Sequence, residues 1–291
     1  MENLKDLKDI VVIYHAHCYD GFGAAWSAWK KFGDNASYVA QKHGDVEILD
    51  RLNGKEIYIV DFAFSKDEML ELEKSAKKLV VIDHHISAEE AVKSLKEFSF
   101  ALDKSGSYLA WEYFHKEEVP LLIKYISDHD IWTHKMPNYE DVGSYIYATE
   151  SGEENFEAFT KLAEELETQE GLKKALEIGS LLRRIHLQKV KEYCEKANLV
   201  SFEGYKIYAV NAPHEVCSEL GHLLSEKTNS FSLSFYFEKD KWKCSLRSVK
   251  DFDVSEIAKR YGGGGHKNAA GFAVSAEFPL PFAKLVEKKE D

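Results

Sequence analysis

Short apolar runs that alternate with helical patterns most constrain the fold of the first half of this chain. The clearest runs are 10–14, 57–60 and 79–82, and their continuous apolar character predicts strands buried on both faces. Weaker patterns predict further elements, namely strands at 37–41 and 98–102 and helices at 21–32, 65–78, 107–115 and 120–127. Strands that alternate with helices predict a parallel sheet with right-handed crossovers.

The second half predicts a helical connector followed by a smaller domain. Residues 154–198 are charged and helical in pattern, with Gly171 and Gly179 as candidate breaks. The segment lacks the Pro, Ser and Gly enrichment of a flexible linker. Later patterns predict strands at 205–210, 231–237, 242–246 and 269–274 and helices at 216–226 and 254–261. We therefore predict an α/β protein with a parallel-sheet domain over 1–150, a helical connector over 151–199 and a mixed-sheet α/β domain over 200–291.

Composition and charge narrow the class of partner. Fifty acidic residues against thirty-eight basic ones give a net charge of -12, which argues against broad binding to long duplexes but allows a local cationic site for a small anion. No apolar run approaches the roughly 18–20 residues of a membrane span, and the N-terminus has no hydrophobic signal core. The cysteines are scattered and predict no disulfide framework. We expect a cytoplasmic protein.

Acidic and histidine side chains follow three of the apolar runs. They lie in four segments, 15–20, Asp61, 83–85 and 128–130, of which the last closes a helical pattern. Ligands bind beyond the carboxyl ends of parallel strands. Carboxylates gathered there repel one another unless cations neutralise them. Histidine and carboxylate without paired thiols suit Mn²⁺ or Mg²⁺, and two such ions form the usual clamp for attack on phosphorus.

Two motifs carry a resemblance to a known family. Asp83-His84-His85 after an apolar strand resembles the signature of the DHH phosphoesterases, which include RecJ exonucleases, nanoRNases, pAp phosphatases, cyclic-dinucleotide phosphodiesterases and exopolyphosphatases. Arg247-Ser248 and the run 262–272, GGGGHKNAAGF, are similar to the DHH-associated C-terminal domain of the first subfamily. The resemblance covers nearly the whole chain. It implies a catalytic metal-binding domain over 1–150, a substrate-binding domain over 200–291 and an active site in the cleft between them.

The resemblance also implies which residues hold a metal ion. Asp20, Asp61, His84 and Asp128 would complete one site, and Asp61 would bridge to a second ion. Asp130 is the alternative fourth ligand. We prefer Asp128 because it directly follows the apolar stretch of its helix.

Two further residues of the tripeptide have implied roles. Asp83 would hold His84 in position without touching the ion. His85 would face the substrate phosphate.

Cys18 departs from the family pattern, which has an Asp at this position. The second ion would then be held by His15 or His17, by Asp61 and by the Cys18 thiolate. A thiolate favours Zn²⁺ or Mn²⁺ over Mg²⁺. Alternatively this second site is weak or empty, or Cys18 is only a small buried side chain.

The glycine run predicts a loop that recognises an anion. Consecutive glycines let backbone N–H groups approach a phosphate closely, and His266 and Lys267 add positive donors. Arg247 can bind a phosphate with two parallel hydrogen bonds. We expect the substrate-binding set to be Arg247, Ser248, Gly263, Gly264, Gly265 and His266, and we expect Arg247 and His266 also to stabilise charge on the phosphoryl oxygens. Trp132 could stack on a base, but we expect it to pack in the core.

Together these features predict a metal-dependent phosphohydrolase. We expect Mn²⁺ as the ion, with Mg²⁺ or Zn²⁺ as alternatives, and one or two ions per chain. The expected substrate is a short oligonucleotide, a linear dinucleotide or pAp, as for a nanoRNase. The alternatives are a single-strand-specific RecJ-like exonuclease, a phosphatase of a smaller substrate and a nucleotide-binding protein with a degenerate metal site.

Overall fold

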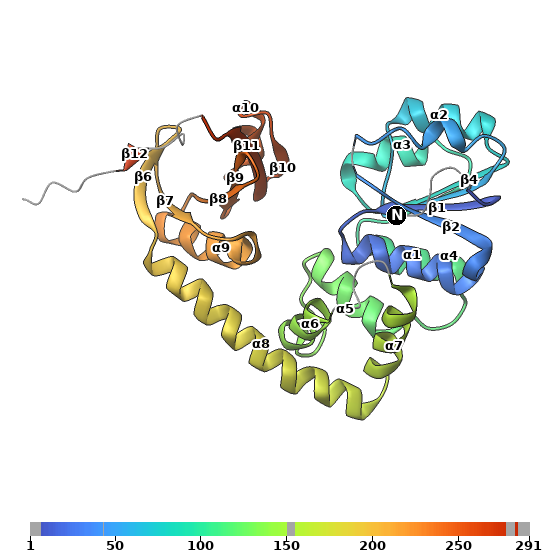
Figure 1. The fold of residues 1–291 in the computed structure, drawn as a ribbon, viewed down its shortest axis with the longest axis horizontal. Helices are drawn as coiled ribbons and strands as arrows, with labels where there is room; N and C mark the ends of the chain where they lie inside the picture. Colours follow the sequence, from blue (N-terminus) through green and yellow to red (C-terminus); the bar gives the residue numbers. More distant parts are fainter. Residues whose placement is uncertain (1–6, 43, 150–154, 278–282, 285–291) are drawn as a thin grey trace, which may run out of the picture. The chain divides into compact units, whose positions relative to one another are not determined.

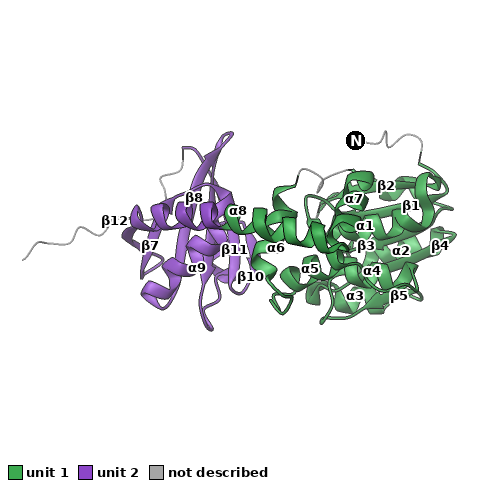
Figure 2. Ribbon diagram, turned by 90° about the horizontal axis from the view of Figure 1, so that it is seen from below, with its two compact units in different colours: residues 1–183 green, residues 184–291 purple. Residues whose placement is uncertain are grey.

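The computed structural model describes residues 7–42, 44–149, 155–277 and 283–284. The chain divides into two compact units, residues 1–183 and residues 184–291 (Figure 2). Each unit is described by itself. Among the described residues, no helix combines the length and the apolar character that a membrane span requires.

The first unit is built on a five-stranded parallel sheet, in agreement with the alternating pattern. Its strand order is β2-β1-β3-β4-β5, and every pairing is parallel. The strands are β1 (Ile10–His15), β2 (Ala36–Gln41), β3 (Glu56–Val60), β4 (Lys78–Asp83) and β5 (Phe98–Phe100). The central strands are buried on both faces because helices cover both sides of the sheet.

Helices α1 (Tyr19–Phe32) and α4 (Gly106–Phe114) cover one face of this sheet, and α2 (Lys66–Ser75) and α3 (Glu89–Lys93) cover the other (Figure 1). Ser65 begins α2 with a reciprocal capping box to Glu68. Short 3₁₀ turns lie at Gly33–Asn35, Leu49–Arg51 and Ile86–Ala88.

Helices α5 (Leu121–Asp130), α6 (Tyr139–Ala148) and α7 (Phe156–Leu166) extend the layer that contains α1 and α4. Trp26 of α1 stacks on Trp111 with ring centroids 5.3 Å apart, and its Nε1 donates to Thr160 Oγ1 at 2.9 Å. This contact ties α7 to the core of the first unit.

The predicted helical connector is two helices, α7 and α8 (Gln169–Glu195). Gly171 and Gly179, our candidate breaks, both lie inside α8. Gly179 packs against the backbone of Asp141, where a β-carbon would collide with the carbonyl oxygen. Gly179 therefore allows close helix packing rather than a break.

The second unit contains a seven-stranded mixed sheet in the order β10-β11-β9-β8-β7-β6-β12. β7 and β8 pair in parallel, and all other neighbours are antiparallel. The strands are β6 (Asn198–Phe202), β7 (Tyr205–Asn211), β8 (Phe231–Glu238), β9 (Lys241–Ser248), β10 (Gly264–His266), β11 (Ala269–Ser275) and β12 (Ala283–Lys284). The helices are the 3₁₀ turn His214–Val216, α9 (Cys217–Thr228) and α10 (Ser255–Arg260). The predicted mixed-sheet α/β architecture is confirmed.

Candidate metal centre

Asp61 lies at the centre of a cluster of carboxylates and histidines at the carboxyl edge of the parallel sheet. It directly follows β3, and its backbone N–H donates to the Ile82 carbonyl at 2.8 Å. Its φ of 52° is in the left-handed region, which is uncommon for a residue other than glycine. The side chain is 1% exposed, and neither carboxylate oxygen accepts a hydrogen bond from a residue that the structure describes. A buried carboxylate in this state is costly to ionise unless a positive charge compensates it.

Imidazole nitrogens approach both oxygens of Asp61. His84 Nε2 lies 3.3 Å from Oδ1, and His15 Nδ1 lies 3.7 Å from Oδ2. Burial raises the pKa of Asp61 well above its ordinary value, and the nearby charge of Asp20 raises it further. The cluster therefore accommodates an ionised Asp61 poorly without a cation.

Asp20 joins the cluster from the first turn of α1 and is fixed there by the beginning of α4. Its Oδ2 accepts the Gly106 N–H at 2.7 Å, and its Oδ1 accepts the Ser107 N–H at 3.1 Å and the Ser107 hydroxyl at 2.5 Å. The N-terminus of a helix stabilises such a negative charge. Asp20 Oδ2 also lies 3.8 Å from His84 Nε2. From the sequence we interpret residues 105–107 as a turn and helix cap, although the resemblance implies that this loop lies near the active site; the hydrogen bonds to Asp20 were not foreseen.

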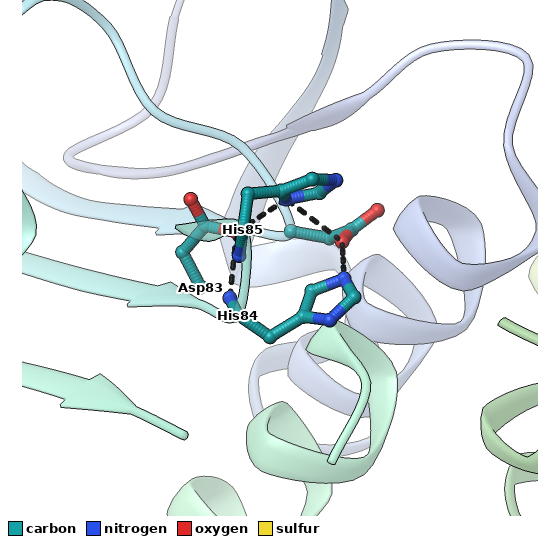
Figure 3. A group of neighbouring side chains, drawn as sticks. Asp83, His84 and His85 are labelled. Carbon is teal, nitrogen blue, oxygen red and sulfur yellow. Dashed lines mark hydrogen bonds and ion pairs between the residues drawn. The ribbon is translucent and has the colours of Figure 1, made fainter. Parts of the chain in front are cut away.

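Asp83 orients His85 rather than His84. Its Oδ1 accepts hydrogen bonds from the backbone N–H groups of His84 at 2.7 Å and His85 at 3.3 Å, and it lies 2.7 Å from His85 Nδ1 (Figure 3). The bond to Asp83 raises the pKa of His85. Asp83 therefore holds the ring of His85 through Nδ1 and touches His84 only at its backbone, which corrects our expectation that it orients the His84 ring.

Asp130, and not Asp128, lies in the cluster. Asp130 Oδ2 is 3.3 Å from His84 Nε2, and burial together with the charge of Asp20 raises the pKa of Asp130 to about 7. Our preference for Asp128 as the fourth metal ligand is not supported, because its carboxylate is used elsewhere.

Asp128 anchors the turn that follows α5. Its Oδ1 accepts the Thr133 hydroxyl at 2.6 Å and the Lys135 N–H at 2.7 Å, and its Oδ2 accepts the Met136 N–H at 3.0 Å. Burial opposes ionisation of Asp128, but these hydrogen bonds lower its pKa below the ordinary value.

Cys18, which stands where the family pattern has an Asp, lies beside the cluster, in one group with His15 and Asp61. It occupies the N-cap position of α1 without a side-chain capping bond. Burial and the charges of Asp61 and Asp20 raise the pKa of the Cys18 thiol. A cation beside the sulfur would reverse that effect and favour the thiolate.

Among the residues that the structure describes, the potential ligand atoms form three overlapping groups, within each of which they lie no more than 4.8 Å apart. The groups are Asp61, Asp83, His84 and His85; His15, Cys18 and Asp61; and Asp20, His84 and Asp130. Asp61 and His84 each belong to two groups. The unpartnered oxygens of Asp61 and the mixed oxygen and nitrogen donors fit divalent cations. His17, the alternative to His15, is in none of these groups.

The residues expected to bind substrate lie in the second unit, and the sheet register brings two of them together. Arg247 of β9 pairs with Ala269 of β11, which pairs in turn with His266 of β10. Directly opposed residues of antiparallel strands point to the same face. Arg247 and His266 therefore share one face of the sheet, with a small side chain between them.

Contacts with α9 hold the Arg247 side chain. Its Nη2 donates to Ser218 Oγ at 3.2 Å, and a β-carbon on Gly221 would lie 2.6 Å from Arg247 Cγ. Glycine at position 221 therefore leaves the space in which the arginine lies.

The glycine run forms a tight approach between β10 and β11. Gly265 has a φ of 140°, and its β-carbon would lie 2.5 Å from Ala270 Cα. Gly263 is packed against Gly271 and Phe272 in the same way. The Ser248 hydroxyl donates to the Phe252 carbonyl at 2.7 Å and accepts from Asn268 Nδ2 at 2.9 Å. Ser248 therefore secures the loop next to this face, and its contact with substrate stays a prediction.

Comparisons with known proteins agree with both units. Residues 204–288 match the DHHA1 domain family. The chain is 32% identical over 312 residues to Uncharacterized protein R106 of Acanthamoeba polyphaga mimivirus, across 97% of this chain and 71% of that protein. It is also 41% identical to Oligoribonuclease NrnB of Bacillus subtilis over 61 residues, and this matched segment covers 21% of this chain and 15% of NrnB.

A solved structure shows the same fold over most of the chain. The pGpG-specific phosphodiesterase PggH of Vibrio cholerae superimposes with a TM-score of 0.50 at 14% identity, across 92% of this chain and 94% of that one. Three observations indicate the same family, namely the Asp-His-His tripeptide at the end of β4, the fold and the match of the C-terminal residues. The chain belongs to the DHH family of phosphoesterases and carries a DHHA1 domain in its second unit.

Proposed function

We propose that this protein is a metal-dependent hydrolase of phosphodiester bonds in short oligonucleotides or small nucleotide phosphoesters. The observation that carries the proposal is Asp61, a buried carboxylate that accepts no hydrogen bond from a described residue and belongs to two overlapping groups of ligand atoms. Such an arrangement costs folding free energy unless cations occupy it.

Two sets of side chains would hold the ions. Asp20, Asp61, His84 and Asp130 would hold one, and His15, Cys18 and Asp61 would hold the other. The carboxylates suit Mn²⁺ or Mg²⁺, whereas imidazole and a thiolate suit Zn²⁺. We favour Mn²⁺, with Mg²⁺ and Zn²⁺ as the alternatives. When bound, the ions supply positive charge for the phosphoryl oxygens and lower the pKa of the attacking water.

His85 supplies a proton donor beside this centre. Asp83 Oδ1 accepts from Nδ1 and so leaves Nε2 as the other site of the ring that carries a proton. The raised pKa of His85 favours the doubly protonated ring. His85 Nε2–H can therefore donate to a phosphoryl oxygen and stabilise the charge that develops there.

The second unit would bind the rest of the substrate. Arg247 and His266 share a face of its sheet, and both donate to phosphate oxygens in this proposal. Gly264, where a β-carbon would meet nothing within 4 Å, leaves the backbone open to an anion in this proposal, while Gly263 and Gly265 allow the close approach of β10 to β11 that forms the loop.

Our preference for a small substrate is based on the net charge of the protein and on the activities that the names of two similar proteins give. A net charge of -12 disfavours long polyanions, and the names of NrnB and PggH refer to an oligoribonuclease and to a dinucleotide phosphodiesterase. We therefore favour a short nucleotide substrate. The four free cysteines suit the reducing cytoplasm as its location.

A chromatographic hydrolysis assay with Mn²⁺ tests the proposal. The panel contains a 5′-phosphorylated RNA dinucleotide, a five-residue RNA, a long single-stranded DNA, pAp and a cyclic dinucleotide, and Asp61→Asn is the blank. We expect rapid loss of the short RNAs with the native protein and none with the blank. Preferred cleavage of the long DNA would indicate an exonuclease instead. Binding without turnover of any member would indicate a nucleotide-binding protein.

A further inference from the structure

A chain of aromatic and imidazole rings borders the candidate metal centre and has no part in the proposed hydrolysis. We call Tyr19, His129, Trp132, His134 and Tyr147 the aromatic rim. Its ring centroids follow one another at 4.5 Å between Tyr19 and Tyr147, 5.1 Å between Tyr147 and His129, 5.7 Å between His129 and Trp132 and 4.5 Å between Trp132 and His134. The rim thus forms a continuous set of ring contacts.

Trp132 is the most exposed member of the rim. Its side chain is 68% exposed, so our expectation that it packs in the core is wrong. A tryptophan left in solvent forgoes the large gain from burial of its apolar surface. His129 and Tyr147, which continue the ring contacts from Trp132, are exposed as well, and a contiguous exposed patch of this kind is typical of a binding surface.

The backbone is strained in order to present this ring. Trp132 has a φ of 57° and His134 a φ of 52°, which is unfavourable for bulky residues. Asp128 stabilises the turn against this strain, because its carboxylate accepts three hydrogen bonds from Thr133, Lys135 and Met136. Strain that is stabilised in this way and lies beside a cluster of ligand atoms indicates a functional turn.

The rim is continuous with the ion-binding side chains. His129 and Trp132 flank Asp130 in the sequence, and Asp130 contacts His84 at 3.3 Å. At the other end, Tyr19 lies between Cys18 and Asp20 in the sequence, and its hydroxyl donates to the Tyr147 carbonyl at 3.1 Å. A phosphate at the centre would therefore place the nucleoside attached to it within reach of the rim.

We propose that the aromatic rim is a stacking site for the nucleobase next to the phosphate that is cleaved, with Trp132 as its main surface. This inference rests on the proposed function. Unpaired bases stack on aromatic side chains with little regard to sequence, because every base has a π face. An acidic protein attracts a nucleic acid weakly through charge, so stacking offers a source of affinity that does not depend on a basic surface.

Substrates that lack one base test the role of Trp132. The assay compares kcat/KM for a 5′-phosphorylated RNA dinucleotide with its two counterparts in which either nucleotide carries no base. In the native protein we expect loss of one of the two bases to lower kcat/KM roughly 5- to 150-fold, the range of one stacked base. The ratio of kcat/KM with the base to kcat/KM without it should fall to near one in Trp132→Ala. Trp132→Phe should retain most of this ratio.

The matched control is Phe98→Ala. Phe98 is 41% exposed at the start of β5, away from the carboxyl edge of the sheet, and its loss should leave the ratio as in the native protein. An undiminished ratio in Trp132→Ala would overturn the inference. So would a ratio near one in the native protein.

A binding measurement separates this inference from the hydrolysis. The full-length protein is titrated with a dinucleotide whose linkage is a phosphorothioate, and tryptophan fluorescence is recorded. Trp132 is one of five tryptophans, so the difference between the native protein and Trp132→Phe isolates its signal. Quenching that requires the base and vanishes in Trp132→Phe supports the stacking site, even if no substrate is hydrolysed.

Equal quenching in both proteins would overturn the stacking site while leaving the hydrolysis intact. A change of oligomeric state in Trp132→Ala, without an effect on the base-dependent ratio, would show that the rim contacts protein instead and would also overturn it.

Discussion

Gly106 and Asp61 meet so closely that no side chain fits at position 106. A β-carbon there would lie 2.5 Å from the β-carbon of Asp61 and 2.6 Å from its Oδ1. The same glycine donates its N–H to Asp20 at 2.7 Å. One backbone position therefore determines the spacing of two carboxylates of the candidate metal centre.

Gly106→Ala should displace Asp61 and weaken ion binding. We expect at least a tenfold loss of Mn²⁺ affinity and a loss of about 1–3 kcal/mol in the free energy of unfolding, as for overpacked sites. Calorimetric Mn²⁺ titration and denaturant unfolding measure the two effects. Gly143→Ala is the control, because a β-carbon there meets nothing within 4 Å. It should stabilise α6 by about 0.5–1 kcal/mol. Native Mn²⁺ affinity in Gly106→Ala would contradict the expectation.

Asp61→Asn should stabilise the metal-free protein while it abolishes stabilisation by metal. The change removes a carboxylate whose charged form is disfavoured by burial and by the nearby charge of Asp20, so the free energy of unfolding of the metal-free protein should rise. Asparagine also tolerates the left-handed backbone. Thermal unfolding with EDTA and with Mn²⁺ checks both effects, since an ion that binds only the native state raises Tm. Asp103→Asn, an exposed control, should keep the native response. A lower Tm of Asp61→Asn in EDTA would show that the Asp61 charge is compensated without a cation.

Asp130→Asn should weaken Mn²⁺ binding, whereas Asp128→Asn should lower the free energy of unfolding. Asp130→Asn should lower Mn²⁺ affinity at least about tenfold with little change in stability, because loss of a proposed ligand should cost no less than loss of a residue that only orients one. Asp128→Asn removes the charged acceptor of three hydrogen bonds and should cost about 1–3 kcal/mol of stability. Electron paramagnetic resonance of free Mn²⁺ and chemical unfolding distinguish the two variants. Greater loss of affinity in Asp128→Asn would restore Asp128 as the ligand.

Cys18→Ser should change the spectrum of the cobalt-substituted protein. Ligation by the thiolate gives a sulfur-to-cobalt charge-transfer absorption, which the serine variant should lose. Cys18→Asp should lose it as well and should shift the relative affinity from Zn²⁺ toward Mn²⁺ and Mg²⁺, because a carboxylate is a harder ligand. Cys194→Ser, whose thiol lies in the second unit, is the control. If all four proteins have the same spectrum, Cys18 is a packing residue.

The sequence predicted the sheet and its functional edge because continuous apolar runs and the residues that follow them are local patterns. Strands β1, β3 and β4 fall on the three clearest runs, and Asp61 and His84 lie together after them. The mixed sheet of the second unit was likewise foreseen from alternation.

Helical geometry explains why the sequence could not distinguish Asp128 from Asp130. Helix α5 continues to Asp130, and two residues along a helix point in directions that differ by about 200°. The apolar stretch before Asp128 does not reveal which direction faces the sheet edge. The bonds from Asp20 to residues 106 and 107 were equally hidden, because they join segments 86 and 87 positions apart. Trp132 is exposed because it lies in a strained turn, and the turn propensities of its residues do not predict that conformation.

The order of the candidate ligands along the chain has a consequence for biosynthesis. His15 is the first and Asp130 the last, and all precede α8. The ribosome therefore delivers every candidate ligand before it begins the second unit, and domains fold in the order in which they emerge. In the proposed function, the nascent chain would hold its complete ion-binding set while Arg247 and His266 have not yet been translated.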